Sequence, residues 1–245
     1  MFIRETYSTN SLLKAFIAEE FTTASELLRE PLPYLRTDYQ TAGRGQVGNT
    51  WESERGKNIL MSVLLREPAI AVEQQFVLSE VFPLAVVEGV EQVTGAIGLT
   101  IKWPNDIYAG DKKLAGILIE NTLAEGKIAW SILGLGLNVN QTVWQGNAPN
   151  PISLKVLTGR EWDVNELTQA ILQRLKERME TIDPAALRRD YEARLYRREG
   201  WHRYRDEQGE LEARIADIDA YGRLVLELRS GEKRTYHFKE VAYIF

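Results

Sequence analysis

The N-terminal part of the chain has one helical and two extended hydrophobic patterns. A run of apolar residues with helical spacing follows Ser8 and Thr9, and either hydroxyl can cap a helix that extends to about Glu20. Residues 33–39 are typical of an extended segment, and residues 57–66 are rich in Ile, Leu, Met and Val, as in a strand buried on both faces. The glycine-rich segment between these two runs is therefore predicted to be a loop that joins two strands.

The middle of the chain predicts one long helix followed by a group of strands. Residues 72–94 form an amphipathic pattern that ends at Gly95, and glycine often closes a helix in the left-handed conformation. Pro83 lies inside this pattern, so we expect a kink or a division there. Strands are predicted at residues 100–103, 107–108, 114–123 and 128–139. A short turn separates the last two of them, which predicts an antiparallel hairpin.

Two charged helices and a short β-rich tail complete the pattern. The helices are predicted at residues 163–181 and 184–196, with Asp183 as the cap and Pro184 as the first residue of the second helix. Short β-like runs then follow at residues 211–218, 224–228 and 235–238. The chain is therefore predicted to be an α+β protein, with a mixed, largely antiparallel sheet, flanking helices and a small C-terminal β-barrel. The predicted domains are residues 1–196 and residues 197–245.

Composition limits the chemistry that this fold can carry. The 245 residues are 44% hydrophobic and 27% charged, as in ordinary globular proteins, and the formal net charge of −5 does not favour sequence-independent binding to DNA or to anionic membranes. Cysteine is absent, which excludes disulfides and thiol catalysis, and the only histidines, His202 and His237, argue against a multi-histidine zinc site. The sequence has no export signal and no membrane-spanning stretch, so we expect a cytoplasmic protein.

The most distinctive segment is the loop around Arg44. Gly43, Gly45 and Gly48 surround this arginine, so the backbone can approach a bound anion while the guanidinium offers a forked, charged donor. A flexible hairpin loop with a solvated arginine explains the loop alone equally well. The loop lacks the Gly-Lys-Ser/Thr of a P-loop and does not open a helix as a dinucleotide fingerprint does, so kinase-like and Rossmann functions are disfavoured.

Four further polar clusters lie at the ends of predicted elements. They are Ser8-Thr9-Asn10, Lys102-Trp103-Pro104-Asn105-Asp106, Lys113-Leu114-Ala115-Gly116 and Gly134-Leu135-Gly136-Leu137-Asn138. Residues 102–106 can hold a nucleotide and its metal, Lys113 can reach a phosphate over small residues, and residues 134–138 leave room for a flat ligand. Each cluster has an ordinary alternative: a helix cap, a turn, a solvated lysine or close backbone packing. Together with the loop they indicate a ligase that uses ATP to adenylate a small carboxylic acid.

In their order and approximate spacing, these clusters resemble the biotin protein ligase family. The resemblance covers residues 8–10, 40–51, 102–106, 113–117 and 134–138, and the tail after Gly200 is similar to the family's SH3-like C-terminal domain. It implies a catalytic domain of the class II aminoacyl-tRNA synthetase/biotin synthetase-like fold. It also implies an ATP-dependent, AMP-forming biotin–(acetyl-CoA-carboxylase) ligase. Biotin's carboxylate attacks the α-phosphate of MgATP to give biotinyl-5'-AMP and pyrophosphate, and a lysine of a biotin carboxyl carrier domain then attacks the mixed anhydride.

The resemblance also assigns roles to residues. It implies that Lys113 and Arg44 are catalytic and hold the carboxylate and the α-phosphate, where fixed cations stabilise the charge of the transition state. The implied biotin-binding residues are Ser8, Thr9, Gln40, Gly43, Arg44, Gly116, Gly134 and Gly136. The implied nucleotide-binding residues are Asn10, Gly45, Gln46, Gly48, Trp51, Asn105, Lys113 and Asn138, with Trp51 stacked on adenine. Asp106 is the expected Mg²⁺ ligand.

The chain departs from the family pattern in two places. The family usually has Gly-Arg-Gly-Arg, but Gln46 stands at the position of the second arginine, and a neutral amide cannot replace a charge-assisted contact. We therefore predict that the adenylate is held less tightly or that another basic residue compensates; Asn49 likewise offers a polar rather than a basic contact. Ser8 lies so near the first residue that a winged-helix domain has no space before it, so we expect a ligase that does not bind DNA.

Three other functions were compared with this one. A lipoate ligase shares the fold and the acyl-adenylate chemistry, but the chain has no Arg-Arg followed by a Gly-Gly-Gly run and His-Asp. A non-catalytic biotin or nucleotide sensor is disfavoured, because Arg44 and Lys113 are costly to keep in a closed apolar site without an anion. A DNA-binding repressor is disfavoured by the net charge. The implied partners are biotin, MgATP and a carrier domain; a homodimer is compatible with the resemblance, because many family members pair through the central sheet.

Overall fold

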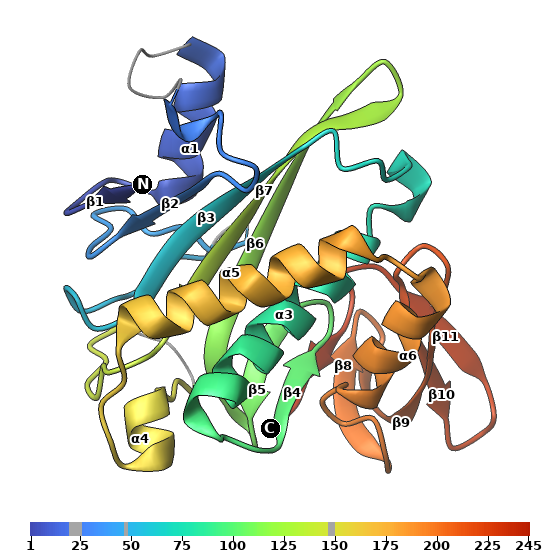
Figure 1. The fold of residues 1–245 in the computed structure, drawn as a ribbon. Helices are drawn as coiled ribbons and strands as arrows, with labels where there is room; N and C mark the ends of the chain where they lie inside the picture. The colour runs from blue at the N-terminus through green and yellow to red at the C-terminus, as the bar shows by residue number, and fades with distance from the viewer. Residues whose placement is uncertain (20–25, 47–48, 147–149) are drawn as a thin grey trace.

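The larger of two sheets organises the molecule, a computed structural model that describes residues 1–19, 26–46, 49–146 and 150–245. Its strands are β1 (Phe2–Ile3), β2 (Tyr34–Thr37), β3 (Ile59–Arg66), β4 (Leu99–Lys102), β5 (Asp106–Ala109), β6 (Lys112–Ala124) and β7 (Lys127–Leu137). Among the described residues they lie in the order β1-β2-β3-β7-β6-β5-β4 (Figure 1). Only β1 and β2 pair in parallel, and the other neighbours are antiparallel. The predicted α+β class, the mixed sheet and the β6–β7 hairpin are confirmed.

Helices cover both faces of this sheet. They are α1 (Thr9–Glu19), α3 (Val77–Thr94), α4 (Leu154–Thr158), α5 (Val164–Glu180) and α6 (Pro184–Ala193), with a short 3-10 turn, η1 (Val72–Gln74). α3 and α5 pack together over one face in the main core, which includes Val63 of β3. α1 lies on the opposite face, where Leu13 packs with Leu64 and Ile132. Neighbouring residues of β3 therefore belong to different cores, as the alternation of side chains along a strand requires.

The ends of the helices agree with the predicted caps in most places. Ser8 rather than Thr9 caps α1, since its hydroxyl oxygen accepts a hydrogen bond from the backbone N–H of Ser11. Asp183 caps α6 with Pro184 as the first residue, as predicted. The expected start of the long helix at residue 72 is wrong, because residues 72–74 form η1 and α3 begins only at Val77. α3 continues through Pro83, which is buried against the core, so the helix is not divided there.

The C-terminal part forms a second, five-stranded sheet. Its strands are β8 (His202–Asp206), β9 (Gly209–Ile218), β10 (Leu224–Leu228), β11 (Lys233–Tyr236) and β12 (Ala242–Tyr243). They lie in the order β11-β10-β9-β8-β12 and all pair antiparallel. The turn before β10 contacts the larger domain, because the indole N–H of Trp103 donates to the carbonyl oxygen of Gly222 at 2.9 Å. The small sheet is thereby fixed beside the β4–β5 edge of the large one.

Of the helices in the described ranges, none has the length and apolar character needed to cross a membrane.

Candidate active site

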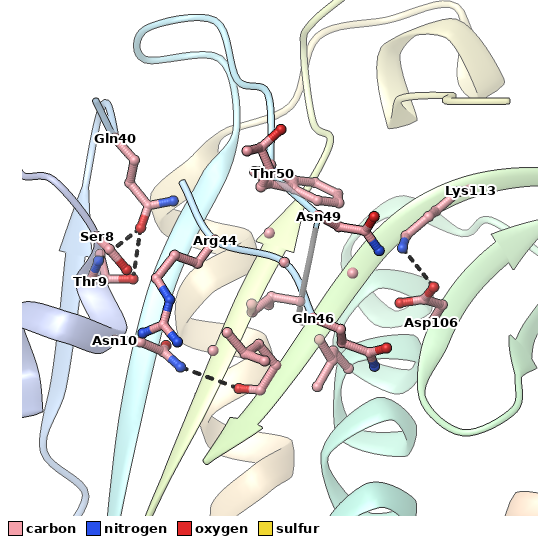
Figure 2. A pocket seen from close by; sticks show the side chains of 18 residues that line it. Ser8, Thr9, Asn10, Gln40, Arg44, Gln46, Asn49, Thr50, Asp106 and Lys113 are labelled. Carbon is pink, nitrogen blue, oxygen red and sulfur yellow. Dashed lines mark hydrogen bonds and ion pairs between the residues drawn. The ribbon is translucent and has the colours of Figure 1, made fainter. Parts of the chain in front are cut away.

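A cavity of about 110 Å³ lies on the α1 face of the large sheet. It is lined by the N-terminus of α1, the glycine-rich loop, the first half of β6 and the C-terminal end of β7 (Figure 2). The predicted site residues that line it are Ser8, Thr9, Asn10, Gln40, Arg44, Gly45, Gln46, Trp51, Asp106, Lys113, Gly116, Gly134 and Gly136. Segments that are far apart in the sequence therefore meet in one cavity.

Hydroxyl and amide groups occupy one end of the cavity. The backbone N–H of Thr9 donates to Oε1 of Gln40 at 2.8 Å, and the Thr9 hydroxyl donates to the same oxygen at 3.2 Å. From β3, the Ser62 hydroxyl lies 2.7 Å from Thr9 Oγ1 and 2.5 Å from Asn10 Oδ1. Because the backbone donors in the first turn of a helix have no partner within the helix, this turn is a suitable place for a polar ligand group.

Asn10 links this end to an acidic residue, Glu120 of β6. Its side-chain amide donates to Glu120 Oε2 at 2.9 Å, and a Cβ atom at Gly134 would lie 2.3 Å from Asn10 Oδ1. Gly134 is therefore needed for the close approach of Asn10. Burial alone would raise the pKa of Glu120, but the hydrogen bond from Asn10 and the charges of Arg44 and Lys14 outweigh it and lower that pKa. Glu120 is thus an ionised carboxylate beside the cavity.

Lys113 and Asp106 form an ion pair at the opposite end of the cavity (Figure 2). Lys113 Nζ lies 2.6 Å from Asp106 Oδ2. The described residues contain no group of three or more His, Cys, Asp or Glu side chains that could enclose a metal ion. The single carboxylate of Asp106 does suit Mg²⁺ in the way that nucleotide sites use it, with one protein carboxylate and the remaining ligands from phosphates and water.

The indole of Trp51 packs on two glycines of the sheet. A Cβ atom at Gly136 would lie 2.4 Å from Trp51 Cε2, and one at Gly116 would lie 2.8 Å from Trp51 Cζ3. Lys113 Nζ lies 5.8 Å from the centroid of the indole. The glycines that the sequence analysis assigned to a flat ligand wall thus make room for Trp51 itself. Stacking of Trp51 on adenine stays a prediction.

Comparisons with known proteins identify relatives of this chain. Residues 18–138 match the family model of the biotin/lipoate A/B protein ligase family, and residues 203–241 match that of the biotin protein ligase C-terminal domain. The chain is 34% identical over 200 residues to the biotin–(acetyl-CoA-carboxylase) ligase of Mycobacterium tuberculosis, a match that covers 79% of this chain and 73% of that protein. This chain belongs to the biotin protein ligase family.

Two further relatives show the extent of the likeness. The bifunctional ligase/repressor BirA of Bacillus subtilis (strain 168) is 41% identical over 122 residues, which are 49% of this chain and only 37% of that protein. The biotin protein ligase of Aquifex aeolicus, solved in complex with biotin and ATP, superimposes with a TM-score of 0.77 at 25% identity and covers 99% of this chain and 97% of that one. The C-terminal sheet is consistent with the SH3-like barrel that the sequence predicts.

Three residues that the resemblance assigned to ligands lie outside the lining of the cavity. Asn138 is buried and its amide donates to the carbonyl oxygen of Ile152 at 3.1 Å, so it fixes the chain after β7. Asn105 is also buried, in the turn between β4 and β5. Gly43 lets the two arms of the loop meet, since a Cβ atom there would lie 2.4 Å from the carbonyl oxygen of Trp51. The carbonyl oxygen of Gly43 accepts from the Trp51 N–H at 3.0 Å. Gly48 lies outside the described residues.

Two residues of the site were missed by the sequence analysis. Ser62 lies in an apolar stretch of β3 and Glu120 follows the apolar residues 117–119 of β6, and both are on the face of the sheet that α1 covers. A polar residue inside a strand predicted to be buried is the signal that could have marked Ser62, because such a residue needs a hydrogen-bond partner. The same rule would have marked Glu120 as a charge with a partner elsewhere in the chain.

Proposed function

We propose that this member of the biotin protein ligase family activates biotin with MgATP and transfers it to a lysine of a biotin carboxyl carrier domain. The observation that carries the proposal is the cavity itself, which brings the polar first turn of α1 together with two cations from distant segments, Arg44 and Lys113. The chain spans less than half the length of the two Bacillus ligase/repressor relatives that it matches. The activity therefore rests on the cavity and its fit to the chemistry.

The α1 end of the cavity fits the ureido ring of biotin. A ureido group has two N–H donors and one carbonyl acceptor, and Ser8, Thr9 and Gln40 offer hydroxyls and an amide to match them. We assign Asn10 to this end as well, rather than to the nucleotide, because it is hydrogen-bonded to Ser62 and Glu120 there.

The two cations fit the first chemical step. An oxygen of the biotin carboxylate attacks the α-phosphorus of ATP and forms a new oxygen–phosphorus bond. The bond between the α-phosphorus and the oxygen of the leaving pyrophosphate breaks. Arg44 and Lys113 can hold the carboxylate and the α-phosphate at the distance of attack and stabilise the charge on the phosphoryl oxygens. Mg²⁺ beside Asp106 would neutralise charge on the leaving pyrophosphate when it is bound with ATP.

The second step transfers biotin from the adenylate to the acceptor. The neutral amine of the acceptor lysine attacks the carbonyl carbon of the mixed anhydride and loses a proton to solvent as the amide bond forms. AMP leaves with the electron pair of the broken C–O bond. Gln46 lines the cavity where the family usually has an arginine. Looser retention of the adenylate therefore stays a prediction, and Gln46→Arg should slow its release; an unchanged release rate would contradict it.

The size of the cavity requires side chains to move when ligands enter. Small-molecule sites usually measure roughly 300–1,000 Å³, whereas this cavity measures about 110 Å³. Side chains that line it, Trp51 among them, must therefore shift before biotin and ATP fit together. Once the ligands are held, exclusion of water also protects the mixed anhydride from hydrolysis.

The test is the intact mass of an apo biotin carrier domain after incubation with this protein, MgATP and biotin. A parallel reaction contains lipoic acid in place of biotin. We expect a mass increase of one biotin that requires ATP and is lost with Lys113→Ala, while Lys176→Ala on the exposed face of α5 serves as the matched control. A lipoyl increase would move the protein to lipoate ligation, and no increase in either reaction would indicate a protein that only binds.

A further inference from the structure

Both cations of the site are paired with acidic residues of the chain itself. Lys113 contacts Asp106 at 2.6 Å, and Arg44 Nη2 contacts Glu120 Oε1 at 3.2 Å. An anionic ligand that uses Arg44 must therefore compete with Glu120 for the guanidinium. It must also approach a carboxylate of its own sign.

Glu120 has partners on three different segments. Oε2 accepts from Asn10, while Oε1 contacts both Arg44 and the ammonium of Lys14, whose Nζ lies 3.5 Å away. The side chain of Glu120 is only 18% exposed, whereas those of Arg44 and Lys14 are about half exposed. Arg44 also donates to the hydroxyl of Ser11 at 3.1 Å. The cations can therefore move into solvent or toward a ligand, but the carboxylate stays in place.

We propose that Glu120 is an exchangeable counter-ion that holds Arg44 in the empty site and releases it to the carboxylate of the substrate. The proposal rests on the proposed function, because it concerns the binding of biotin at the same cavity. Lys14 completes the exchange: it keeps Glu120 paired after Arg44 has turned toward the substrate. Without Lys14, the departure of Arg44 would leave a partly buried carboxylate with only the hydrogen bond from Asn10, which is unfavourable.

Through this exchange, Glu120 affects how strongly the site distinguishes a ligand with a carboxylate from a neutral ligand of the same shape. A ligand without a carboxylate has no reason to remove Arg44 from Glu120, so its affinity should not depend on the charge at position 120. Biotin and biotin amide form such a pair, because they share the ureido and thiophane rings and differ in charge. The ratio of their dissociation constants isolates the contribution of Arg44 and Glu120.

The experiment measures both dissociation constants by titration calorimetry for the wild type, Glu120→Gln, Lys14→Met and the double variant. Glutamine keeps an oxygen that accepts from Asn10 but removes the charge. We expect Glu120→Gln to bind biotin about threefold more tightly, as for a partly exposed ion pair, and Lys14→Met to bind it about twofold more weakly. Biotin amide should bind equally to all variants. Lys14→Met should have no further effect in the Glu120→Gln background, because Lys14 acts through Glu120.

Several results would overturn the inference. Equal weakening of biotin and biotin amide in Glu120→Gln would show that Glu120 only supports the fold of the site, and an unchanged ratio would show that its charge does not matter. An effect of Lys14→Met that persists in the double variant would show that Lys14 acts by itself. Lys176→Met, which removes an exposed lysine paired with Glu180 on α5, is the control for net charge. If the wild type binds neither compound, the proposed function fails first.

Discussion

At the scale of single residues, the sequence predicted which side chains meet but not what each one contacts. Gly134, Gly136 and Gly116 were expected to form a wall for the ligand. In the structure the side chains of Asn10 and Trp51 pack against these glycines, because a Cβ atom at any of them would lie within 3 Å of one of those side chains. Contacts of this kind join residues more than sixty positions apart, so no local pattern reveals them. The partners of Glu120 on α1 and in the glycine-rich loop are equally distant in the sequence, so a local pattern can mark this residue but not its contacts.

The contact between Gly136 and Trp51 leads to a prediction about Gly136→Ala. The new methyl group would lie 2.4 Å from Trp51 Cε2, so the indole must move or the strands must separate. Overpacking of this kind usually costs roughly 1–3 kcal/mol of unfolding free energy. We expect a loss in that range in urea unfolding, together with slower biotinylation.

The control for this prediction is the same change in a Trp51→Ala background. Removal of the indole makes room for the methyl group, so Gly136→Ala should then cost much less stability. Additive losses in the double variant would show that the methyl group disturbs the backbone of β7 rather than Trp51.

At the scale of elements, the long patterns were predicted well and the short ones poorly. α6 begins at its predicted cap, Asp183, and α5 begins one residue after its predicted start, Asp163, which caps it; an aspartate side chain that accepts backbone hydrogen bonds is a local signal. β1, α4, β8 and β12 were not predicted. Each spans five residues or fewer, so its hydrophobic periodicity is too brief to detect, and tertiary contacts determine it instead.

The cap of α6 provides the prediction at this scale. Asp183 Oδ1 accepts from the backbone N–H groups of Ala185 and Ala186, at 2.9 and 3.3 Å. Asp183→Ala should lower the unfolding free energy by about 1 kcal/mol, and Asp183→Asn should retain most of the stability because the amide oxygen still caps the helix. Thermal unfolding of the two variants checks this; equal losses would show that the charge of Asp183 matters more than its hydrogen bonds.

At the scale of the whole molecule, the order of the strands and the attachment of the C-terminal sheet could not be predicted. β7 lies between β3 and β6, so β3 pairs with a strand more than sixty residues further along the chain. The predicted boundary at residues 196 and 197 stays a proposal. It falls between α6 and β8, and contacts between the two parts cross it through Trp103, Phe76 and Arg188. The N-terminal part and the C-terminal sheet are therefore expected to unfold together.

Arg188 of α6 connects the C-terminal sheet to α3. Its guanidinium donates to the carbonyl oxygens of Ile218 and Asp219, and its Nε lies 2.5 Å from Oε1 of Glu80, whose side chain is only 2% exposed. Burial raises the pKa of Glu80, and the charge of Arg188 opposes that increase. Arg188→Met would leave the carboxylate buried and unpaired, which typically costs roughly 3–5 kcal/mol.

The loss of unfolding free energy in Arg188→Met should be smaller at acidic than at alkaline pH. Without Arg188, the pKa of Glu80 rises further above its ordinary value in the folded state, so the folded protein takes up a proton that the unfolded chain does not hold. The contribution of this proton to the free energy of unfolding is fully present below the pKa that Glu80 has in the unfolded chain. It is lost as the pH rises through the raised pKa that Glu80 has in the folded state. Urea unfolding should therefore show a smaller loss at acidic than at alkaline pH, and Glu80→Gln combined with Arg188→Met should remove the difference. A loss that is equal at both pH values would mean that the lost contacts to residues 218 and 219, rather than the uncovered charge of Glu80, destabilise the variant.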